Sequence, residues 1–174
     1  MISRADLEAR GDALPRPHAH CYWLLPGRVL AGEHPGGAAR VHTIEDAGVT
    51  HFIDLTAAHD GIADYAPQRA QHARHAIADF GIPSVEGMRA TLDAIDAALD
   101  SGGVVYLHCR AGIGRTGTVA ACLLVDHGFA PDEALAALAA KWQANAKSAF
   151  VSRTPETEAQ RAFVLNWKPA QRAR

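Results

Sequence analysis

Apolar residues along the chain fall into two kinds of pattern, short continuous runs and helical stripes. Continuous runs rich in β-branched and aromatic residues predict buried strands, because such side chains pack well on a pleated surface. Four runs of this kind lie at 22–25, 28–31, 49–56 and 104–108. The first two flank Pro26-Gly27, which is a typical turn pair, so together they predict a β-hairpin.

Helical periodicity is clearest after Ser84, a residue type that often caps a helix N-terminus. From there apolar residues recur at spacings of three and four, the stripe of an amphipathic helix: Val85, Met88, Leu92, Ile95 and Leu99. Further helices are predicted near 38–47 and over 118–125, 131–142 and 154–167, and a short one in the first 20 residues. Residues 68–75 fit either a helical turn or an extended segment.

The order of these elements predicts the fold class. Strands and one helix come first, then the 104–108 strand, and helices fill most of the rest. This order predicts an α/β fold of three layers, in which helices flank a central, mostly parallel mixed sheet. We interpret residues 1–20 as an N-terminal arm and residues 21–170 as a single domain, which is large enough for a sizeable core.

Composition narrows the classes of function. Among 174 residues, 17 Lys and Arg are balanced by 19 Asp and Glu, which argues against a basic nucleic-acid-binding surface. No apolar run approaches the ~20 residues of a membrane span, and the first ten residues lack the apolar centre of a signal peptide. Three widely spaced cysteines argue against a disulfide framework. We therefore expect a cytoplasmic protein that binds neither nucleic acid nor membrane. We also expect a monomer, although composition does not bear on the oligomeric state.

The stretch after the 104–108 strand combines a cysteine, glycines and an arginine just before a predicted helix. Backbone N–H groups of such a loop and of the first helical turn lack partners, so they can point at the oxygens of a dianion. Glycine permits the φ values that turn successive N–H groups inward. We therefore expect substrate phosphate to be bound by Arg110, Ala111, Gly112, Ile113, Gly114 and Thr116.

Cys109 and Arg115 carry the predicted chemistry of this loop. A thiol at a helix N-terminus beside a guanidinium ionises more readily than a free thiol, and the thiolate is the nucleophile. The planar fork of Arg115 can hold two phosphoryl oxygens, which a lysine cannot do. The Thr116 hydroxyl lies where it can hydrogen-bond the departing sulfur. The alternative interpretation is an ordinary glycine-rich turn with a buried cysteine.

The motif His-Cys-x-x-Gly-x-Gly-Arg-Thr-Gly, which starts at His108, resembles the active-site loop of cysteine-based protein tyrosine and dual-specificity phosphatases. The segments 23–32 and 155–160 look similar to small atypical dual-specificity phosphatases, so the resemblance covers most of the chain. It implies that residues 21–170 form a phosphatase domain acting on phosphotyrosine in proteins, with or without phosphoserine and phosphothreonine. It implies no metal and no cofactor.

A phosphatase of this kind also needs an acid that protonates the leaving oxygen. Asp79 lies on a turn just before the capped helix, in a segment that resembles the D-x-x-x-P acid loop of the family, and we choose it. Asp60 and Asp64, on a long loop, are the alternatives. The implied mechanism has two displacements. Cys109 takes the phosphoryl group while Asp79 protonates the leaving oxygen, and Asp79 then activates the water that hydrolyses the phosphocysteine.

The resemblance implies two further roles. His108 would hold the loop by hydrogen bonds, and Gln160 would approach the site and orient water; otherwise they are a core histidine and a solvent-facing glutamine. Ala111 and Ile113 stand where phosphoinositide-directed members often carry lysines, which argues against multiply phosphorylated inositides. Phosphoinositides, small phosphorylated metabolites and RNA 5′-phosphates stay open as substrates. A phosphate-binding module without turnover also stays open.

Other residues that suggest chemistry have plainer interpretations. The histidine pairs at 18–20 and 72–75 lack further ligands at zinc-like spacing, so we expect no metal site. Cys122 falls on an apolar predicted helix and is interpreted as a small core residue. The alternative is a protective disulfide between Cys122 and Cys109.

Overall fold

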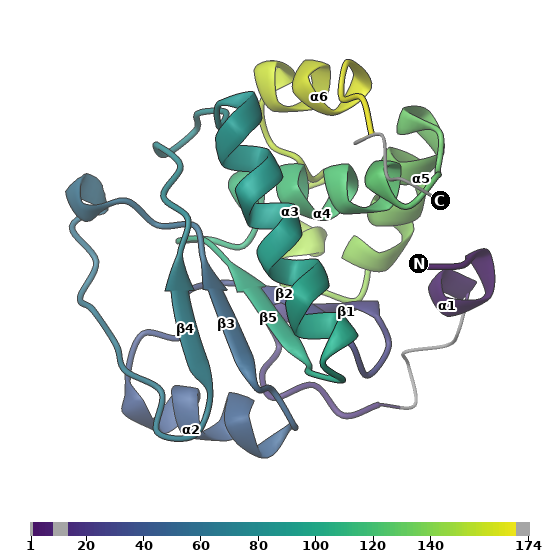
Figure 1. Ribbon diagram of the computed structural model, residues 1–174. Coiled ribbons are helices and arrows are strands. Elements are labelled where there is room, and N and C mark those ends of the chain that lie inside the picture. The colour runs from purple at the N-terminus through teal and green to yellow at the C-terminus, as the bar shows by residue number, and fades with distance from the viewer. Residues whose placement is uncertain (1, 9–13, 170–174) are drawn as a thin grey trace.

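The computed structural model describes residues 2–8 and 14–169 (Figure 1). Within this part of the chain, five strands form one sheet in the order β1-β2-β5-β3-β4. They are β1 (Cys21–Leu25), β2 (Val29–Gly32), β3 (His51–Asp54), β4 (Gln71–Arg74) and β5 (Val105–His108). β1 pairs with β2 antiparallel, and the other neighbours pair in parallel. The predicted mixed, mostly parallel sheet is therefore confirmed.

Helices cover both faces of this sheet, which confirms the three-layer prediction (Figure 1). They are α1 (Arg4–Glu8), α2 (Ala38–Asp46), α3 (Val85–Asp100), α4 (Gly114–Asp126), α5 (Pro131–Trp142) and α6 (Glu158–Leu165), with short 3-10 turns η2 (Ala58–Asp60) and η3 (Ala146–Ala149). Side chains of α3, α4, α5 and α6 form one apolar core, and α2 contributes to a second core across the sheet. None of the described helices is long and apolar enough to cross a membrane.

The alternation of side chains along β5 shows how one strand serves both cores. Val105 and Leu107 belong to the core that contains α3 to α6, whereas Tyr106 belongs to the core that contains α2. Successive side chains of a strand point to opposite faces, and here both faces are covered. This explains why the 104–108 run is continuously apolar rather than alternating.

Two helices begin at residues other than those predicted. α4 begins at Gly114 rather than at residue 118, because its glycines are packing positions rather than loop positions. A Cβ at Gly117 would lie 2.0 Å from Thr154 Oγ1, so only glycine fits there. α6 begins at Glu158 rather than at 154–156, since Thr157 is its N-cap and accepts a hydrogen bond from the Gln160 N–H.

The remaining predictions differ from the structure at exposed or terminal positions. Val85 is 54% exposed although the apolar stripe places it inside, because it lies in the first turn of α3, beyond the edge of the core. Trp167 is buried, but it lies after α6 ends. Residues 71–74 are extended, so the extended alternative for 68–75 is the correct one. The boundary at residue 20 stays a prediction; Ile2 is buried in the main core.

Candidate active site

The candidate site lies where β5 ends and α4 begins. β5 ends at His108, and residues 109–113 form a loop before α4 starts at Gly114. We call residues 109–115 the phosphate loop. β5 is the middle strand of the sheet, and the carboxyl ends of parallel strands are the usual position for a ligand site in such folds. Cys109 is 3% exposed at the start of this loop.

The carbonyl groups of the phosphate loop are held from outside the loop. The donors are His108 Nδ1 to Cys109 O (3.3 Å), His34 N to Arg110 O (3.1 Å), Lys147 Nζ to Ala111 O (2.8 Å) and Thr154 Oγ1 to Ile113 O (2.6 Å). The C=O and N–H of one peptide unit point in opposite directions. Carbonyls that face outward therefore turn the following N–H groups inward.

Those inward N–H groups have no acceptor in the described residues from Arg110 to Arg115. The two at the start of α4, on Gly114 and Arg115, are among the donors that any helix leaves unpaired at its N-terminus. Adjacent unpaired N–H groups that face one concavity, together with the helix dipole, bind an anion well. The loop therefore offers unpaired N–H donors, and its role as a phosphate cradle stays a prediction.

Gly112 is required by the close approach of two chain segments. Its φ is 74°, in the left-handed region that glycine enters without strain. A Cβ at Gly112 would lie 2.4 Å from the Gly32 carbonyl carbon and 2.6 Å from the Glu33 backbone nitrogen. The phosphate loop therefore packs directly on the backbone that follows β2.

Arg115 is 1% exposed and pairs with two carboxylates. Its Nη1 donates to Asp60 Oδ2 at 2.6 Å and to Ile77 O at 2.9 Å, and its Nη2 donates to Asp79 Oδ1 at 2.7 Å. Burial opposes charge on this guanidinium, but the hydrogen bond to Asp60 raises the pKa of Arg115 overall. Arg115 therefore stays charged at the base of the site.

The three acid candidates and Asp54, the last residue of β3, have different surroundings. The Asp60 side chain is fully buried, and although burial opposes its charge, the hydrogen bond from Arg115 lowers the pKa of Asp60. The Asp79 side chain is 37% exposed, and its Oδ1 also accepts the Phe80 N–H. Asp64 is 82% exposed and pairs with Arg74, while Asp54 is buried under Arg74 and Thr56. Only Asp79 is both partly exposed and in contact with Arg115 among these four; its role as the acid stays a prediction.

His108 is buried behind the loop in a defined tautomer. Its Nδ1 lies 3.3 Å from Cys109 O, which can only accept, so Nδ1 carries the proton. Nε2 then accepts a hydrogen bond from Tyr65 Oη at 2.5 Å. Burial lowers the pKa of His108 to about 3, so the ring is neutral. This hydrogen bond joins the ring to the first residue of the loop, and the role that the resemblance gives to His108 stays a prediction.

Gln160 is buried between the phosphate loop and the loop that carries Asp79. Its Nε2 donates to Gly81 O at 3.1 Å, while its Oε1 accepts the Glu156 and Thr157 N–H groups. Its amide lies so close to Gly114 that a Cβ there would be 2.8 Å away. Gln160 is therefore not the solvent-facing glutamine of the alternative interpretation. Its predicted role in orienting water stays a prediction.

Several residues of the site were missed by the sequence analysis. Tyr65, Lys147, Thr154 and Glu33 contact the loop or its supports. No local motif marks them, because each reaches the site from a distant segment. The other thiols stay apart from this chemistry: burial raises the pKa of Cys21 to about 11, and burial also raises the pKa of Cys122.

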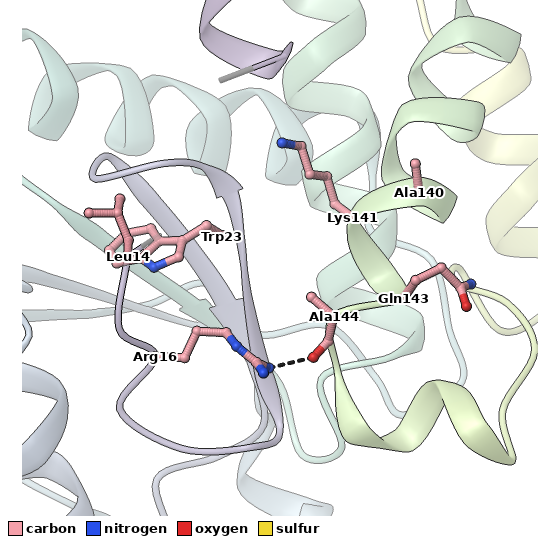
Figure 2. A pocket seen from close by; sticks show the side chains of 7 residues that line it. All are labelled: Leu14, Arg16, Trp23, Ala140, Lys141, Gln143 and Ala144. Atoms are coloured by element: carbon pink, nitrogen blue, oxygen red, sulfur yellow. Dashed lines mark hydrogen bonds between the residues drawn. The ribbon is translucent and has the colours of Figure 1, made fainter. Parts of the chain in front are cut away.

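A second hollow, of about 430 Å³, lies between β1 and the end of α5 (Figure 2). Figure 2 shows Arg16 on one side, donating to Ala144 O on the other. Its described lining is Leu14, Arg16, Trp23, Ala140, Lys141, Gln143 and Ala144. The described side chains that line this hollow include no thiol and no carboxylate, and neither Cys109 nor Asp79 is among them.

Comparison with known proteins agrees with this geometry. A family model described as "Swiss Army Knife protein, DSP-PTPase phosphatase domain" (PTP-SAK) matches residues 18–164. The chain is 25% identical over 138 residues to human "Phosphatidylglycerophosphatase and protein-tyrosine phosphatase 1", covering 75% of this chain and 69% of that protein. The structure of Tk-PTP in its active form superposes with a TM-score of 0.68 at 25% identity, over 84% of this chain and 93% of that one.

The chain is also similar to much longer proteins. It is 30% identical over 74 residues to "Tyrosine-protein phosphatase CDC14" of Candida albicans, which is 42% of this chain but 14% of that protein. The match to the Caenorhabditis elegans protein cdc-14 covers 65% of this chain and 18% of that protein. The chain therefore spans under a fifth of the length of these two relatives.

Proposed function

Because the chain belongs to the DSP-PTPase phosphatase domain family, we propose that it hydrolyses phosphate monoesters through a phosphocysteine on Cys109. One observation carries this proposal: Cys109 lies at the start of a loop whose N–H groups face inward and whose far end bears the buried Arg115. Such a cradle binds a phosphoryl group and stabilises the charge that develops on it in the transition state.

The first displacement forms a bond from Cys109 Sγ to phosphorus and breaks the bond from phosphorus to the ester oxygen. Asp79 gives its proton to that oxygen, which leaves as an alcohol or phenol. In the second displacement, Asp79 takes a proton from water as the water oxygen attacks phosphorus. The sulfur–phosphorus bond breaks, and inorganic phosphate and the thiolate are released.

Asp79 is available for this work because its contact with Arg115 is exchangeable. In the structure Asp79 Oδ1 holds Nη2 of Arg115, and its side chain is partly exposed. A bound phosphate dianion competes for that Nη2 group as a bidentate partner. We infer that substrate displaces Asp79 from Arg115 and leaves its carboxyl group beside the ester oxygen.

Phosphotyrosine in proteins is the substrate that the features of this chain support best. Phe80 and Ile82, on the loop of Asp79, are 60% and 47% exposed, and they offer apolar contact to an aromatic ring. The three relatives described above all carry tyrosine phosphatase in their names. A lipid phosphate is the second candidate, because the human relative's name also includes phosphatidylglycerophosphatase.

The test is hydrolysis of 4-nitrophenyl phosphate and then of a substrate panel. We expect turnover that vanadate blocks and that Cys109→Ser abolishes. Cys21→Ser is the matched control, since a hydroxyl can replace the thiol that donates to His18 O. Phosphotyrosine, phosphoserine and phosphothreonine peptides are then compared with phosphatidylglycerophosphate. Faster hydrolysis of the lipid than of every peptide would contradict the protein substrate, and equal activity of Cys109→Ser would contradict the mechanism.

A further inference from the structure

The carbonyl of Ala111 is the one phosphate-loop carbonyl that a charged side chain holds among the described residues. Lys147 Nζ donates to Ala111 O at 2.8 Å and to Glu33 Oε2 at 2.7 Å. The Lys147 side chain, which comes from η3, is only 16% exposed. The ammonium group is therefore fixed between a carboxylate and the outer side of the loop.

Glu33 is an anchor well suited to a buried ammonium group. Its Oε1 accepts from His20 Nδ1 at 2.9 Å and from Arg40 Nη1 at 2.6 Å, and its Oε2 faces Lys147. Burial opposes its charge, but hydrogen bonds from Lys147 and His20 hold the pKa of Glu33 at about 2. The carboxylate is therefore charged at neutral pH.

The peptide unit from Ala111 to Gly112 needs such an anchor more than its neighbours do. Gly112 lies at φ 74°, and glycine has alternative backbone conformations within easy reach. If this peptide turned over, the Ala111 carbonyl would face the cradle and the Gly112 N–H would leave it. The negative end of the peptide dipole would then point at the phosphate, which opposes anion binding.

We propose that Lys147, held by Glu33, is a positioning residue that keeps the Ala111–Gly112 peptide in its phosphate-binding orientation. The inference rests on the proposed function, since it concerns the same loop. Lys147 touches neither substrate nor sulfur in this role. It acts through one carbonyl group, and its loss weakens the binding of any phosphate-like anion.

The test measures vanadate affinity, KM and kcat for 4-nitrophenyl phosphate in Lys147→Met and in Arg40→Met. Arg40 is the matched control, because it pairs with the same carboxylate and makes no contact with the loop. We expect Lys147→Met to bind vanadate about tenfold more weakly, roughly the contribution of one charged hydrogen bond. KM should rise by a similar factor, and Arg40→Met should stay within about twofold of the wild type.

Two further variants separate positioning from folding. Lys147→Arg keeps a cation that can donate to both oxygens, and it should restore most of the vanadate affinity. Glu33→Gln keeps the side-chain shape and should weaken vanadate binding by about threefold, and it serves where Lys147→Met folds poorly. Equal vanadate affinity in Lys147→Met and Arg40→Met, or a loss confined to kcat, would overturn the inference.

The same measurements distinguish this inference from the proposed function. If the wild-type protein binds vanadate but hydrolyses no ester, the proposed catalytic function is wrong. A tenfold loss of vanadate affinity in Lys147→Met would then still support the positioning role. A wild type that hydrolyses esters while Lys147→Met retains full vanadate affinity would end the positioning role alone. A wild type that neither binds nor hydrolyses would overturn both.

Discussion

At the scale of single residues, Arg115 is held by two carboxylates that differ in exposure. The Asp60 side chain is fully buried, whereas the Asp79 side chain is 37% exposed. A substrate dianion that enters from solvent can replace Asp79 far more easily than Asp60. We therefore expect different roles for the two aspartates: Asp60 orients the guanidinium, and Asp79 is the proposed acid.

This division predicts that Asp79→Asn impairs catalysis in a way that depends on the leaving group. Without an acid, the departing oxygen must leave as an anion, which the more acidic 4-nitrophenol tolerates better than phenol does. We expect kcat/KM for phenyl phosphate to fall by about 10²–10⁴, and by clearly less for 4-nitrophenyl phosphate. Vanadate should bind Asp79→Asn at least as tightly as it binds the wild type. An equal loss for both esters would assign the acid role elsewhere.

Asp60→Asn is predicted to give the opposite signature. The amide keeps the shape of the carboxylate but loses the charge that holds Arg115 Nη1 at 2.6 Å. We expect kcat/KM to fall by a similar factor for both esters, and vanadate affinity to fall roughly tenfold, as for the loss of a charge-assisted hydrogen bond. Steady-state kinetics and vanadate titration check this. A loss that depends on the leaving group would make Asp60 the acid.

The residues that sequence reasoning found and missed differ in how local their contacts are. Cys109 and Arg115 were found because a five-residue spacing, with glycines between them, already describes one loop. Tyr65 was missed because it lies 43 residues before His108, and Lys147 because it lies 36 residues after Ala111. Supports of this kind depend on tertiary packing, which spacing along the chain does not reveal.

At the scale of elements, the phosphate loop depends on the backbone of Gly112. Gly112→Ala is predicted to destabilise the protein and to weaken phosphate binding, because its Cβ would lie 2.4 Å from the Gly32 carbonyl carbon. Gly102→Ala is the control: its φ of 79° is similar, but a Cβ there meets nothing within 4 Å.

Gly102→Ala should reduce the free energy of unfolding by about 1 kcal/mol, the cost of the left-handed conformation alone. Gly112→Ala should lose roughly 1–3 kcal/mol more, because the two backbones must separate. Urea unfolding measures both changes, and vanadate titration shows whether the loop keeps its shape. Equal losses in the two variants would mean that contact between the loop and Gly32 contributes little.

α6 links the phosphate loop to the loop of Asp79 through one amide group. Gln160→Glu keeps the oxygen that accepts the Thr157 N–H but replaces the N–H that donates to Gly81 O. We expect kcat to fall at least fivefold, as for the loss of one hydrogen bond, and the free energy of unfolding to fall as well, because the new carboxylate is buried against the Gly81 carbonyl oxygen.

Thr157→Ala is the converse variant. It removes the N-cap of α6 and should lower the free energy of unfolding by about 1 kcal/mol, while kcat changes by less than twofold. Kinetics and urea unfolding of both variants test the link. A larger loss of kcat in Thr157→Ala than in Gln160→Glu would place the effect in the helix rather than in the amide.

Elements with strong periodicity were predicted well, and those with mixed surroundings were not. The apolar residues of β5 form a continuous run that fits a buried strand, and those of α3 recur at helical spacing. Each pattern therefore predicts one type of element. β4 is an edge strand, Gln71-His72-Ala73-Arg74, and its side chains are mostly exposed. Its sequence therefore has no apolar face from which a strand could be predicted. The start of α4 was misplaced because glycines, which usually indicate a loop, are needed there for close packing.

At the scale of the whole molecule, the parallel sheet gathers one site from loops that are distant in sequence. Loops at the carboxyl ends of β2, β3, β4 and β5 supply Glu33, Asp60, Asp79 and Cys109 in turn. Parallel neighbours bring their carboxyl ends to one edge of the sheet. The order of the strands therefore brings together the proposed nucleophile, the proposed acid and the residues that support the phosphate loop and Arg115.

The whole fold is also predicted to lose stability in mild acid through two neutral histidines, the partly buried His18 and the buried His108. His18 Nδ1 accepts the His20 N–H at 3.2 Å, so Nε2 carries the proton and donates to Tyr106 Oη. Burial lowers the pKa of His18 to about 4, and burial lowers that of His108 to about 3. A histidine in the unfolded chain titrates near 6.5. Between that pH and the lower pKa values of the folded protein, the unfolded chain therefore binds more protons than the folded protein does.

The free energy of unfolding should therefore be highest above pH 6.5 and fall as the pH is lowered towards 4. Each of these histidines contributes a slope of up to about 1.4 kcal/mol per pH unit. Glu33, whose folded pKa is about 2, is ionised in both the folded and the unfolded state above about pH 5. It therefore does not contribute to the pH dependence of stability above that pH. Urea unfolding at pH 7, 6 and 5 should give a shallower slope for His18→Gln than for the wild type. Parallel slopes would mean that His18 is protonated in the folded protein, against the bond that its Nδ1 accepts.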